Sequence, residues 1–283
     1  KVRNGPKSVC LWHVAGVPHA APGVMTAYAD SVPMVILGGN VTSDALGKRD
    51  FQDTPSAEMY APITKWSHRV RHGSELARDL AKALAIAGSG RPGPVMLDVP
   101  FDFFVEKTEI EVPGAPAHPS APGGDPAAIA RACESLLSAK KPVILAGGGV
   151  VTADASAELL EVAEMLCLPI ASGRSASKGV VSEDHPLALG TSGSFGWPIA
   201  NEYLREADCW LAIGTTFSQI AMQDWSVPAP ATLIHIDIDS AEIGKIYKPT
   251  VGVIGDAKLV LAQIRDRLRA KGAATKDYRT HPR

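Results

Sequence analysis

Acidic side chains gather where apolar segments of the sequence end. The segment 232–239 (TLIHIDID) closes on Asp237 and Asp239, and the segment 251–256 (VGVIGD) closes on Asp256. In open parallel sheets, ligands bind outside the carboxyl ends of the strands, and acidic residues there often accept ribose hydroxyl groups. We therefore predict that the three carboxylates form an acidic rim that contacts a nucleotide. Ordinary turns at the strand ends are the alternative.

A run of three glycines, Gly147, Gly148 and Gly149, follows the apolar segment 142–146. Glycine carries no side chain, so a backbone at this place can approach a phosphate or a ring closely. The spacing is not that of the GxGxxG dinucleotide fingerprint, and we expect the next helix to begin several residues later. The run predicts a ligand-contacting loop or, equally, a loop that needs positive φ angles.

Three histidines occupy different places relative to the expected strands. His13 follows the apolar segment 8–12, and His19 lies at the start of a helical pattern. Both would lie near the carboxyl end of a strand, where a catalytic or binding role is open to them. His235 lies within an apolar strand, which favours a core histidine. The aspartates above lack the His or Cys spacing of a metal site, so we predict no metal ligands in this chain.

The elements that position these residues alternate between strands and helices. In the first part of the chain, apolar segments at 8–12, 32–39 and 94–100 alternate with helical patterns at 22–30 and after Ser74, which is expected to cap its helix. The apolar face of that helix comprises Leu76, Leu80, Ala83, Leu84 and Ala87. Strands alternating with helices predict a parallel sheet covered on both faces.

The second part of the chain repeats this pattern. Asp125 and Pro126 form a strong helix start, because a capping side chain precedes a proline at a position that needs no N–H group. The expected buried face of that helix comprises Ile129, Cys133, Leu136 and Leu137. Strands are expected at 142–149, 169–173, 209–214, 232–239 and 251–256, and helices at 156–166, 199–207 and 256–269. Apolar strands that end in Gly or Asp indicate an open doubly wound sheet.

These patterns predict an α/β fold with two parallel-sheet domains, of which the second is an open doubly wound, Rossmann-like domain. Residues 111–125 are rich in proline, glycine and alanine, a composition that suits an extended linker. We therefore expect a first domain at 1–110, a second domain at 126–272 and a loose tail at 273–283.

The composition excludes several classes of partner. The chain has 283 residues, 46% of them hydrophobic, and a formal net charge of −2, with basic and acidic residues interspersed. No polyanion groove is indicated, so we predict no nucleic-acid partner. The apolar stretches of the sequence end well before the roughly 18 residues that a membrane span requires. The four cysteines are scattered singly, which is typical of buried thiols in a reducing compartment, and we predict a cytoplasmic protein.

Seven motifs follow one another along almost the whole chain. They read TAYADSVPMVILGGN, FQDTPSAEMYAPITKW, GRPGPVMLDVP, KPVILAGGGV, EDHPLALG, HIDIDSAEIGK and VIGDAKLVL. In this order they resemble thiamine-diphosphate enzymes of the acetolactate synthase superfamily. The resemblance covers the second half of that family's pyrimidine-binding domain and the whole of its central domain. It implies formation or cleavage of a C–C bond beside a carbonyl group, with the thiazolium ylid as electron sink.

The resemblance also assigns roles to residues of the first domain. Gly16, His19, Asn40 and Gln52 match positions that line the aminopyrimidine or the substrate, with His19 where an asparagine is usual. His13 resembles an active-site histidine of benzoylformate decarboxylase-like members. The resemblance therefore predicts His13 as the catalytic residue and the other four as cofactor-binding residues.

Arg91 stands in a stiff turn of glycines and prolines at 88–94. It matches the arginine that reaches the dinucleotide in flavin-bearing members, and a rigid turn would keep this forked donor aimed at a phosphate or a ring. A solvated arginine in a strand-entry turn is the alternative. Phe101 departs from the family, because acetolactate synthases usually carry a lysine there, near the active-site entrance; the substrate is therefore left open.

In the central domain, the glycine run, the segment 190–196 and the acidic rim resemble the family's flavin or ADP cradle. FAD or ADP is therefore the implied ligand of this domain. At 215–219 the chain reads TTFSQ, whereas acetolactate synthases usually carry an RFDDR run. Because this segment offers no arginine, we expect ADP-type ligands to compete well against FAD.

The family's cofactor-activating glutamate would lie upstream of Lys1, and its GDG…N motif for magnesium and diphosphate would lie beyond Arg283. We therefore expect a fragment that is inactive alone. The complete enzyme is expected to use thiamine diphosphate and Mg²⁺, to act on a 2-oxo acid such as pyruvate, and to form a homodimer or homotetramer. Alternatives within the superfamily are a 2-hydroxyacyl-CoA lyase, an oxalyl-CoA decarboxylase or a benzoylformate decarboxylase-like member, with acyl-CoA substrates for the first two. A non-catalytic nucleotide-binding module is the alternative from another class.

Overall fold

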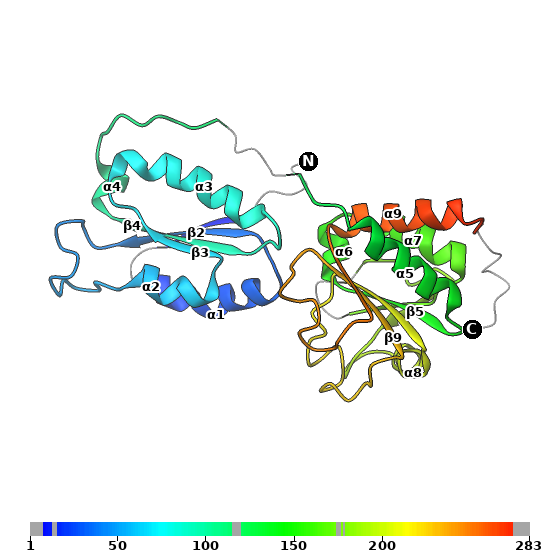
Figure 1. Cartoon of the computed structure of the whole chain (residues 1–283). Helices are drawn as coiled ribbons and strands as arrows, with labels where there is room; N and C mark the ends of the chain where they lie inside the picture. The colour runs from blue at the N-terminus through cyan, green and yellow to red at the C-terminus, as the bar shows by residue number, and fades with distance from the viewer. Residues whose placement is uncertain (1–7, 13–15, 115–119, 174–176, 178, 274–283) are drawn as a thin grey trace. The chain divides into compact units, whose positions relative to one another are not determined.

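The computed structural model describes residues 8–12, 16–114, 120–173, 177 and 179–273 (Figure 1). The chain divides into two compact units, Lys1–Ser120 and Ala121–Arg283, and the division falls within the segment 111–125. Each unit contains one sheet, and every strand pair that the structure describes is parallel. The predicted α/β class with two parallel sheets is therefore confirmed.

The first unit carries a four-stranded sheet. Its elements are β1 (Ser8–Trp12), α1 (Gly16–Ala29), β2 (Met34–Asn40), α2 (Ser56–Tyr60), a 3-10 helix (Ala61–Ile63), β3 (Trp66–Arg69), a second 3-10 helix (Gly73–Glu75), α3 (Leu76–Gly88), β4 (Pro94–Pro100) and α4 (Asp102–Val105). The strand order is β1-β2-β4-β3. Figure 1 shows α3 on one face of this sheet and α1 and α2 on the other.

Residues of the two central strands alternate between the two helical layers. Val35, Val95 and Leu97 pack with α3, whereas Ile36 and Met96 pack with α1 and α2. Because β4 has a neighbour strand on each side and helices on both faces, all of its residues are buried. The carboxyl ends of β2, β3 and β4 therefore meet at one edge of a rigid sheet.

The second unit carries a six-stranded sheet. Its elements are α5 (Pro126–Ser138), β5 (Pro142–Ala146), α6 (Gly148–Thr152), α7 (Ser156–Leu166), β6 (Ile170–Ser172), β7 (Ala188–Thr191), α8 (Pro198–Glu206), β8 (Cys209–Ile213), β9 (Thr232–Asp237), β10 (Val251–Ile254) and α9 (Ala257–Ala270). The strand order is β10-β9-β8-β5-β6-β7. The chain thus adds β6 and β7 on one side of β5 and then β8, β9 and β10 on the other side. This is the doubly wound, Rossmann-like order that the sequence predicted, with its switch point between β5 and β8.

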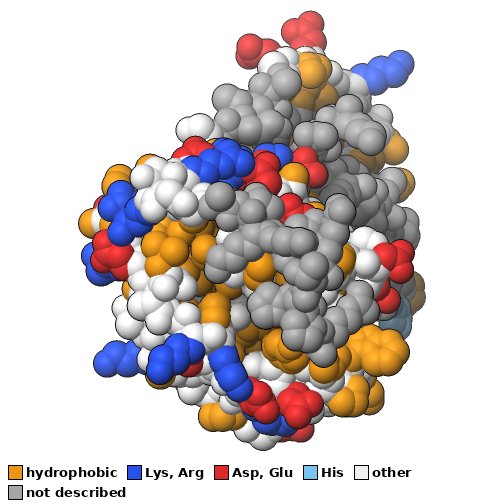
Figure 2. Space-filling view, turned by 90° about the vertical axis from the view of Figure 1, so that its right-hand side faces the viewer, with side chains coloured by type: hydrophobic (Ala, Val, Ile, Leu, Met, Phe, Trp, Pro, Cys, Tyr) orange, Lys and Arg blue, Asp and Glu red, His pale blue; other side chains and the backbone are white. Residues whose placement is uncertain are grey.

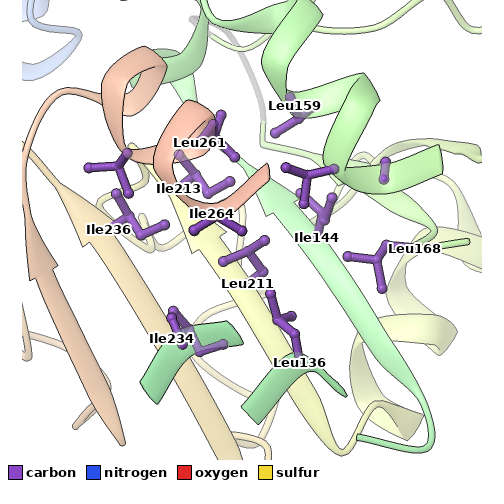
Figure 3. Close-up of a cluster of buried hydrophobic side chains, with 14 of the residues drawn as sticks. Leu136, Ile144, Leu159, Leu168, Leu211, Ile213, Ile234, Ile236, Leu261 and Ile264 are labelled. Atoms are coloured by element: carbon purple, nitrogen blue, oxygen red, sulfur yellow. The ribbon is translucent and has the colours of Figure 1, made fainter. Parts of the chain in front are cut away.

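Two apolar layers hold this sheet. Figure 3 shows the larger layer, in which side chains of β5, β8 and β9 meet those of α5, α7 and α9; the labelled residues are Leu136, Ile144, Leu159, Leu168, Leu211, Ile213, Ile234, Ile236, Leu261 and Ile264. On the opposite face, Ala200 and Leu204 of α8 pack with Val143, Leu145 and Trp210. Alternate residues of each strand thus serve opposite layers, which fixes the register of the sheet.

Helix starts were predicted with mixed success. Asp125 caps α5 by accepting from the backbone N–H of Ala128 at 2.9 Å, as predicted. Ser74 was wrong as a cap, because a 3-10 turn precedes α3 and its N-cap residue is Glu75, without a side-chain hydrogen bond. The first helix begins at Gly16 rather than at 22, with Pro22 inside it.

Three further expectations about the second unit need correction. Leu137 is 45% exposed, because the buried face of α5 runs through Ala132 and Leu136 instead. The helix after the glycine run begins at once, at Gly148, rather than several residues later. The edge strand β7 was missed; all of its residues are only partly buried, so its sequence carries no pattern of a buried strand.

The surface mixes charges of both signs. On the face that Figure 2 shows, Lys and Arg side chains lie among Asp and Glu side chains and apolar residues. Within the described part of the chain, no helix is long and apolar enough to cross a membrane. Cys133 and Cys209 are buried as expected, whereas Cys167 is partly exposed.

Candidate functional site

A buried polar network closes the carboxyl end of the first sheet. Asn40, the last residue of β2, and Asp98 of β4 are both 0% exposed. The Asn40 amide Nδ2 donates to Asp98 Oδ1 at 3.0 Å and to the carbonyl oxygen of Thr54 at 2.9 Å, and its Oδ1 accepts from the N–H of Val41 at 2.9 Å. Arg69 Nε donates to Asp98 Oδ2 at 2.7 Å. The carboxamide of Asn40 is therefore engaged within the protein.

Burial acts against the charge in this network. Desolvation raises the pKa of Asp98, although the hydrogen bonds from Arg69 and Asn40 favour the carboxylate. Arg69 keeps its charge, because the bond to Asp98 and the nearby Glu58 raise its pKa. A buried carboxylate held by one guanidinium and one amide is costly to disturb, since removing either partner leaves a polar group without a partner.

The other predicted residues of the first domain lie around the same edge. Gln52, in the loop 41–55, is exposed, its φ is 68°, and its side chain makes no hydrogen bond within the described residues. Gly16 and His19 lie in the first turn of α1, and His19 is exposed. Because β1 pairs in parallel with β2, the start of α1 lies at the carboxyl edge that Asn40 closes. His13 lies outside the described residues.

Two polar side chains that the sequence analysis missed join this loop to α4. The N–H and the Oγ of Ser43 donate to the two carboxylate oxygens of Asp102, at 2.8 and 2.6 Å. The N–H of Phe101, which is 46% exposed, donates to the carbonyl oxygen of Asn40 at 3.1 Å. These partners are far apart in the sequence, so no local sequence pattern predicts their contacts. A shallow cleft beside this junction is lined by Ser43, His72, Asp102 and Glu106.

Arg91 is held by its own unit. Its Nε donates to Ser31 Oγ at 2.8 Å, and an Nη donates to the carbonyl oxygen of Ala29 at 3.5 Å. Lys65 reaches the same turn from the other side, where its Nζ donates to the carbonyl oxygen of Ser89 at 2.6 Å. Burial lowers the pKa of Lys65. The stiff turn thus ties α1, α3 and β4 together, and a ligand role for Arg91 stays a prediction.

In the second unit, backbone atoms fill the switch point between β5 and β8. The N–H of Gly147 donates to the carbonyl oxygen of Ile213 at 2.8 Å, and the N–H of Gly149 to that of Gly214 at 3.0 Å. A Cβ on Gly147 would lie 2.0 Å from the Gly214 oxygen, and a Cβ on Gly149 would lie 2.6 Å from the Gly214 Cα. These glycines therefore let two loops touch, and their amides are already bonded. Gly148 begins α6 beside them.

The loop 190–196 is also braced from within. Gly193, at φ 104°, donates its N–H to Asn201 Oδ1 at 2.8 Å and accepts from Asn201 Nδ2 at 3.0 Å. The N–H of Ser194 donates to the carbonyl oxygen of Ile220 at 2.9 Å, which joins this loop to the one after β8. Phe195 and Trp197 are 76% and 61% exposed. The segment between β7 and α8 thus presents two aromatic rings at the carboxyl edge of the sheet.

The three carboxylates of the predicted rim each accept a backbone N–H group. Asp237 Oδ1 accepts from Asp239 at 2.9 Å, and Asp239 Oδ1 accepts from Ala241 at 3.0 Å. Asp256 caps α9 by accepting from Lys258 and Leu259. The structure brings these aspartates to the ends of the adjacent strands β9 and β10. A contact with ribose stays a prediction.

His235 is the core histidine that the sequence favoured. It is 0% exposed, its Nε2 lies 3.2 Å from the carbonyl oxygen of Thr215, and its ring meets that of Phe217 edge to face at 4.9 Å. Its Nδ1 has no hydrogen-bond partner among the described residues. Burial lowers its pKa. Phe217, in the segment that lacks arginines, is buried at φ 48°.

Comparison with known proteins identifies the family that the sequence of this chain resembles. Residues 129–264 match the model of the thiamine pyrophosphate enzyme central domain. A probable acetolactate synthase large subunit of Methanocaldococcus jannaschii is 40% identical over 269 residues, which cover 92% of this chain and 45% of that protein. The acetolactate synthase isozyme 1 large subunit of Escherichia coli is 36% identical over 264 residues, which cover 92% of this chain and 46% of that protein. The chain thus spans about half the length of the curated relatives it matches.

The doubly wound sheet and the family match define the second unit as a central domain of the thiamine-pyrophosphate enzyme class. Over 92% of its length, the chain is similar to acetolactate synthase large subunits. The resemblance read from seven motifs is therefore confirmed. Within the described residues, no group of three His, Cys, Asp or Glu side chains could hold a metal ion.

Proposed function

We propose that this chain is part of an acetolactate-synthase-like enzyme that forms or cleaves a C–C bond beside the carbonyl group of a 2-oxo acid such as pyruvate. The observation that carries the proposal is the similarity to acetolactate synthase large subunits, which extends over 92% of the chain. Because the chain covers about 45% of such a subunit, the proposal assigns further parts of the machinery to residues outside it. The chain alone is then inactive.

Thiamine diphosphate would supply the electron sink for the bond that forms or breaks. The carboxyl edge of the first sheet fits a polar ring, because the exposed amide of Gln52 has no hydrogen bond within the described residues. Gln52 would donate to or accept from the aminopyrimidine, and Gly16 and His19 would line its other side. Asn40 would not use its amide Nδ2 group in the same way, because this group already donates to Asp98 and to the carbonyl oxygen of Thr54.

A nucleotide in the second unit is a separate part of the proposal, and the structure narrows it. The glycine run is less suited to a phosphate, because the N–H of Gly147 donates to the carbonyl oxygen of Ile213 and the N–H of Gly149 to that of Gly214. ADP or FAD would instead lie across Asp237, Asp239 and Asp256, with Phe195 and Trp197 as ring surfaces. ADP is the better candidate, since the segment 215–219 contains no arginine.

The proposal also covers the assembly. Magnesium and the diphosphate would be held by residues outside this chain, and the complete enzyme would be a cytoplasmic homodimer or homotetramer. The relatives are named as large subunits, which supports association of chains.

A lyase or decarboxylase acting on acyl-CoA is the second candidate, favoured by the exposed Phe101 and by the sequence TTFSQ at 215–219.

The experiment is a turnover assay with the complete gene product that contains this chain. We expect acetolactate from pyruvate, dependent on both thiamine diphosphate and Mg²⁺, and no product from residues 1–283 alone above a no-protein control. Turnover of 2-hydroxyacyl-CoA or oxalyl-CoA in place of pyruvate would favour the second candidate. If none of these substrates is turned over in a thiamine-dependent manner, the proposed function is refuted.

A further inference from the structure

We propose that Asp98 and Arg69 are positioning residues that act through Asn40 to hold the loop carrying Gln52. The inference rests on the proposed function only for what Gln52 contacts. The part of the inference that concerns how the loop is held involves this chain alone and is tested separately.

Asp98 is the anchor of the arrangement. It lies within β4, with Gly38 of β2 and Arg69 of β3 as its register partners. A central strand covered on both faces cannot shift without disrupting the sheet, so its carboxylate has a fixed position. Arg69 Nε donates to one oxygen of this carboxylate at 2.7 Å, which favours the charged form and fixes its orientation.

Asn40 connects the fixed carboxylate of Asp98 to the loop by hydrogen bonds. One side of its Nδ2 group faces both oxygens of Asp98, at 3.0 and 3.2 Å, and the same group donates to the carbonyl oxygen of Thr54 at 2.9 Å. The Oδ1 is bonded to the N–H of Val41, so the amide cannot flip without losing a bond. The carbonyl of Thr54 is therefore tied, through one side chain, to the centre of the sheet.

Gln52 lies two residues before that tether. The loop 41–55 contains left-handed backbone at Gly47, Arg49 and Gln52, with φ values of 73°, 61° and 68°. For residues other than glycine, this conformation is unfavourable unless the surroundings impose it. The hydrogen bond to Thr54 is a partly buried contact that can impose it on Gln52.

Arg69 supplies a second connection to the same segment. Its Nη2 lies 3.6 Å from Glu58 Oε2, and Glu58 belongs to α2, which begins at Ser56 directly after the loop. Asp98 is thus linked to both Thr54 and α2. Placing the Asp98 carboxylate in a buried position is costly for stability, which suits a role in fixing one conformation.

The first test measures hydrogen exchange in the chain itself. The N–H groups of Gly47, Phe51 and Asp53 are bonded within the loop, so their exchange reports its opening. In Asn40→Ala, we expect exchange of these amides to rise roughly ten-fold, the factor that corresponds to about 1.4 kcal/mol. Asp98→Asn keeps the shape of the site and is the second variant, in case Asn40→Ala does not fold.

Thr64→Val is the matched control. Thr64 is buried and donates to the carbonyl oxygen of Tyr60 at 2.8 Å, so this variant also loses one buried hydrogen bond but does not touch the loop. Its loop amides should exchange as in the wild type. Equal exchange in Thr64→Val and the network variants, or wild-type exchange in Asn40→Ala and Asp98→Asn, overturns the inference.

The second test uses the complete enzyme. Asp98→Asn should raise the KM for thiamine diphosphate several-fold, whereas Thr64→Val should leave it unchanged at a similar loss of thermal stability. A KM that follows melting temperature in both variants would show a merely structural role. Absence of activity in the wild type refutes the proposed function alone, because the exchange test does not require a cofactor.

Discussion

Replacing Gly147 with alanine distinguishes a glycine that serves the fold from one that serves a ligand. The backbone of Gly147 has φ −97° and ψ −176°, which any residue adopts, so alanine introduces no backbone strain. Its Cβ, however, would lie 2.0 Å from the carbonyl oxygen of Gly214 and 2.6 Å from the Cα of Thr215. Both are backbone atoms, so relief requires the loop after β8 to move away from β5.

The expected cost follows from this contact. Overpacking a core typically costs about 1–3 kcal/mol, and we expect about 3 kcal/mol because no flexible side chain can move aside. In a domain of this size, each kcal/mol of unfolding free energy that is lost lowers the melting midpoint by roughly 2–4 °C. The expected decrease in the melting midpoint is therefore roughly 6–12 °C. This loss should appear without any nucleotide present.

Calorimetry of the second unit's transition is the measurement. Gly179→Ala is the control, because no atom lies within 4 Å of its added Cβ and only its φ of 79° opposes the change. That control should cost about 1 kcal/mol. If Gly147→Ala melts like the wild type but no longer binds ADP, the backbone contact is not what requires glycine, and the reasoning is refuted.

Four further variants or conditions test other parts of the structure. Lys65→Met removes the amine that bonds the carbonyl oxygens of Ile86 and Ser89, and calorimetry should show a loss of about 1–3 kcal/mol in the first unit. Because burial lowers the pKa of His235, its contribution to stability is complete above the unfolded-state pKa of about 6.5 and is lost as pH falls toward the lower folded-state value. Denaturant unfolding from pH 8 to pH 5 should therefore show a smaller pH dependence in His235→Gln than in the wild type. Burial raises the pKa of Cys209 to about 12, so mass spectrometry after iodoacetamide treatment should find it unmodified until the chain unfolds. Gly23→Ala should stabilise α1 by about 0.5–1 kcal/mol, because no atom lies within 4 Å of the added Cβ; a lower melting midpoint would contradict this.

Several features could be predicted because they depend on neighbours in the sequence. Asp125 caps a helix that begins one residue later, and a capping pattern is complete within four residues. The alternation of apolar strands with helices predicted two parallel sheets, since each strand carries its burial in its own composition. His235 could be recognised as a core residue from the apolar residues on either side of it.

The candidate site was predicted in part. Asn40 and Gln52 were singled out by resemblance, but their different situations were not foreseen, because an exposed amide and a buried one look alike in a sequence. Asp98 and Arg69 were missed as partners of Asn40. Asn40 and Asp98 are 58 residues apart, and only the pairing of β2 with β4 brings them together.

What the sequence by itself determined is the class of fold, the positions of most strands and helices, and the resemblance to a superfamily. These properties come from local periodicity, local capping and short motifs, which are read within a few residues. The tertiary structure decided which polar groups are available to a ligand. Gly147 and Gly149 have the composition of a phosphate loop, yet their amides donate to the carbonyl oxygens of Ile213, at the end of β8, and of Gly214. Strand register sets these long-range contacts, and register depends on the packing of the whole sheet.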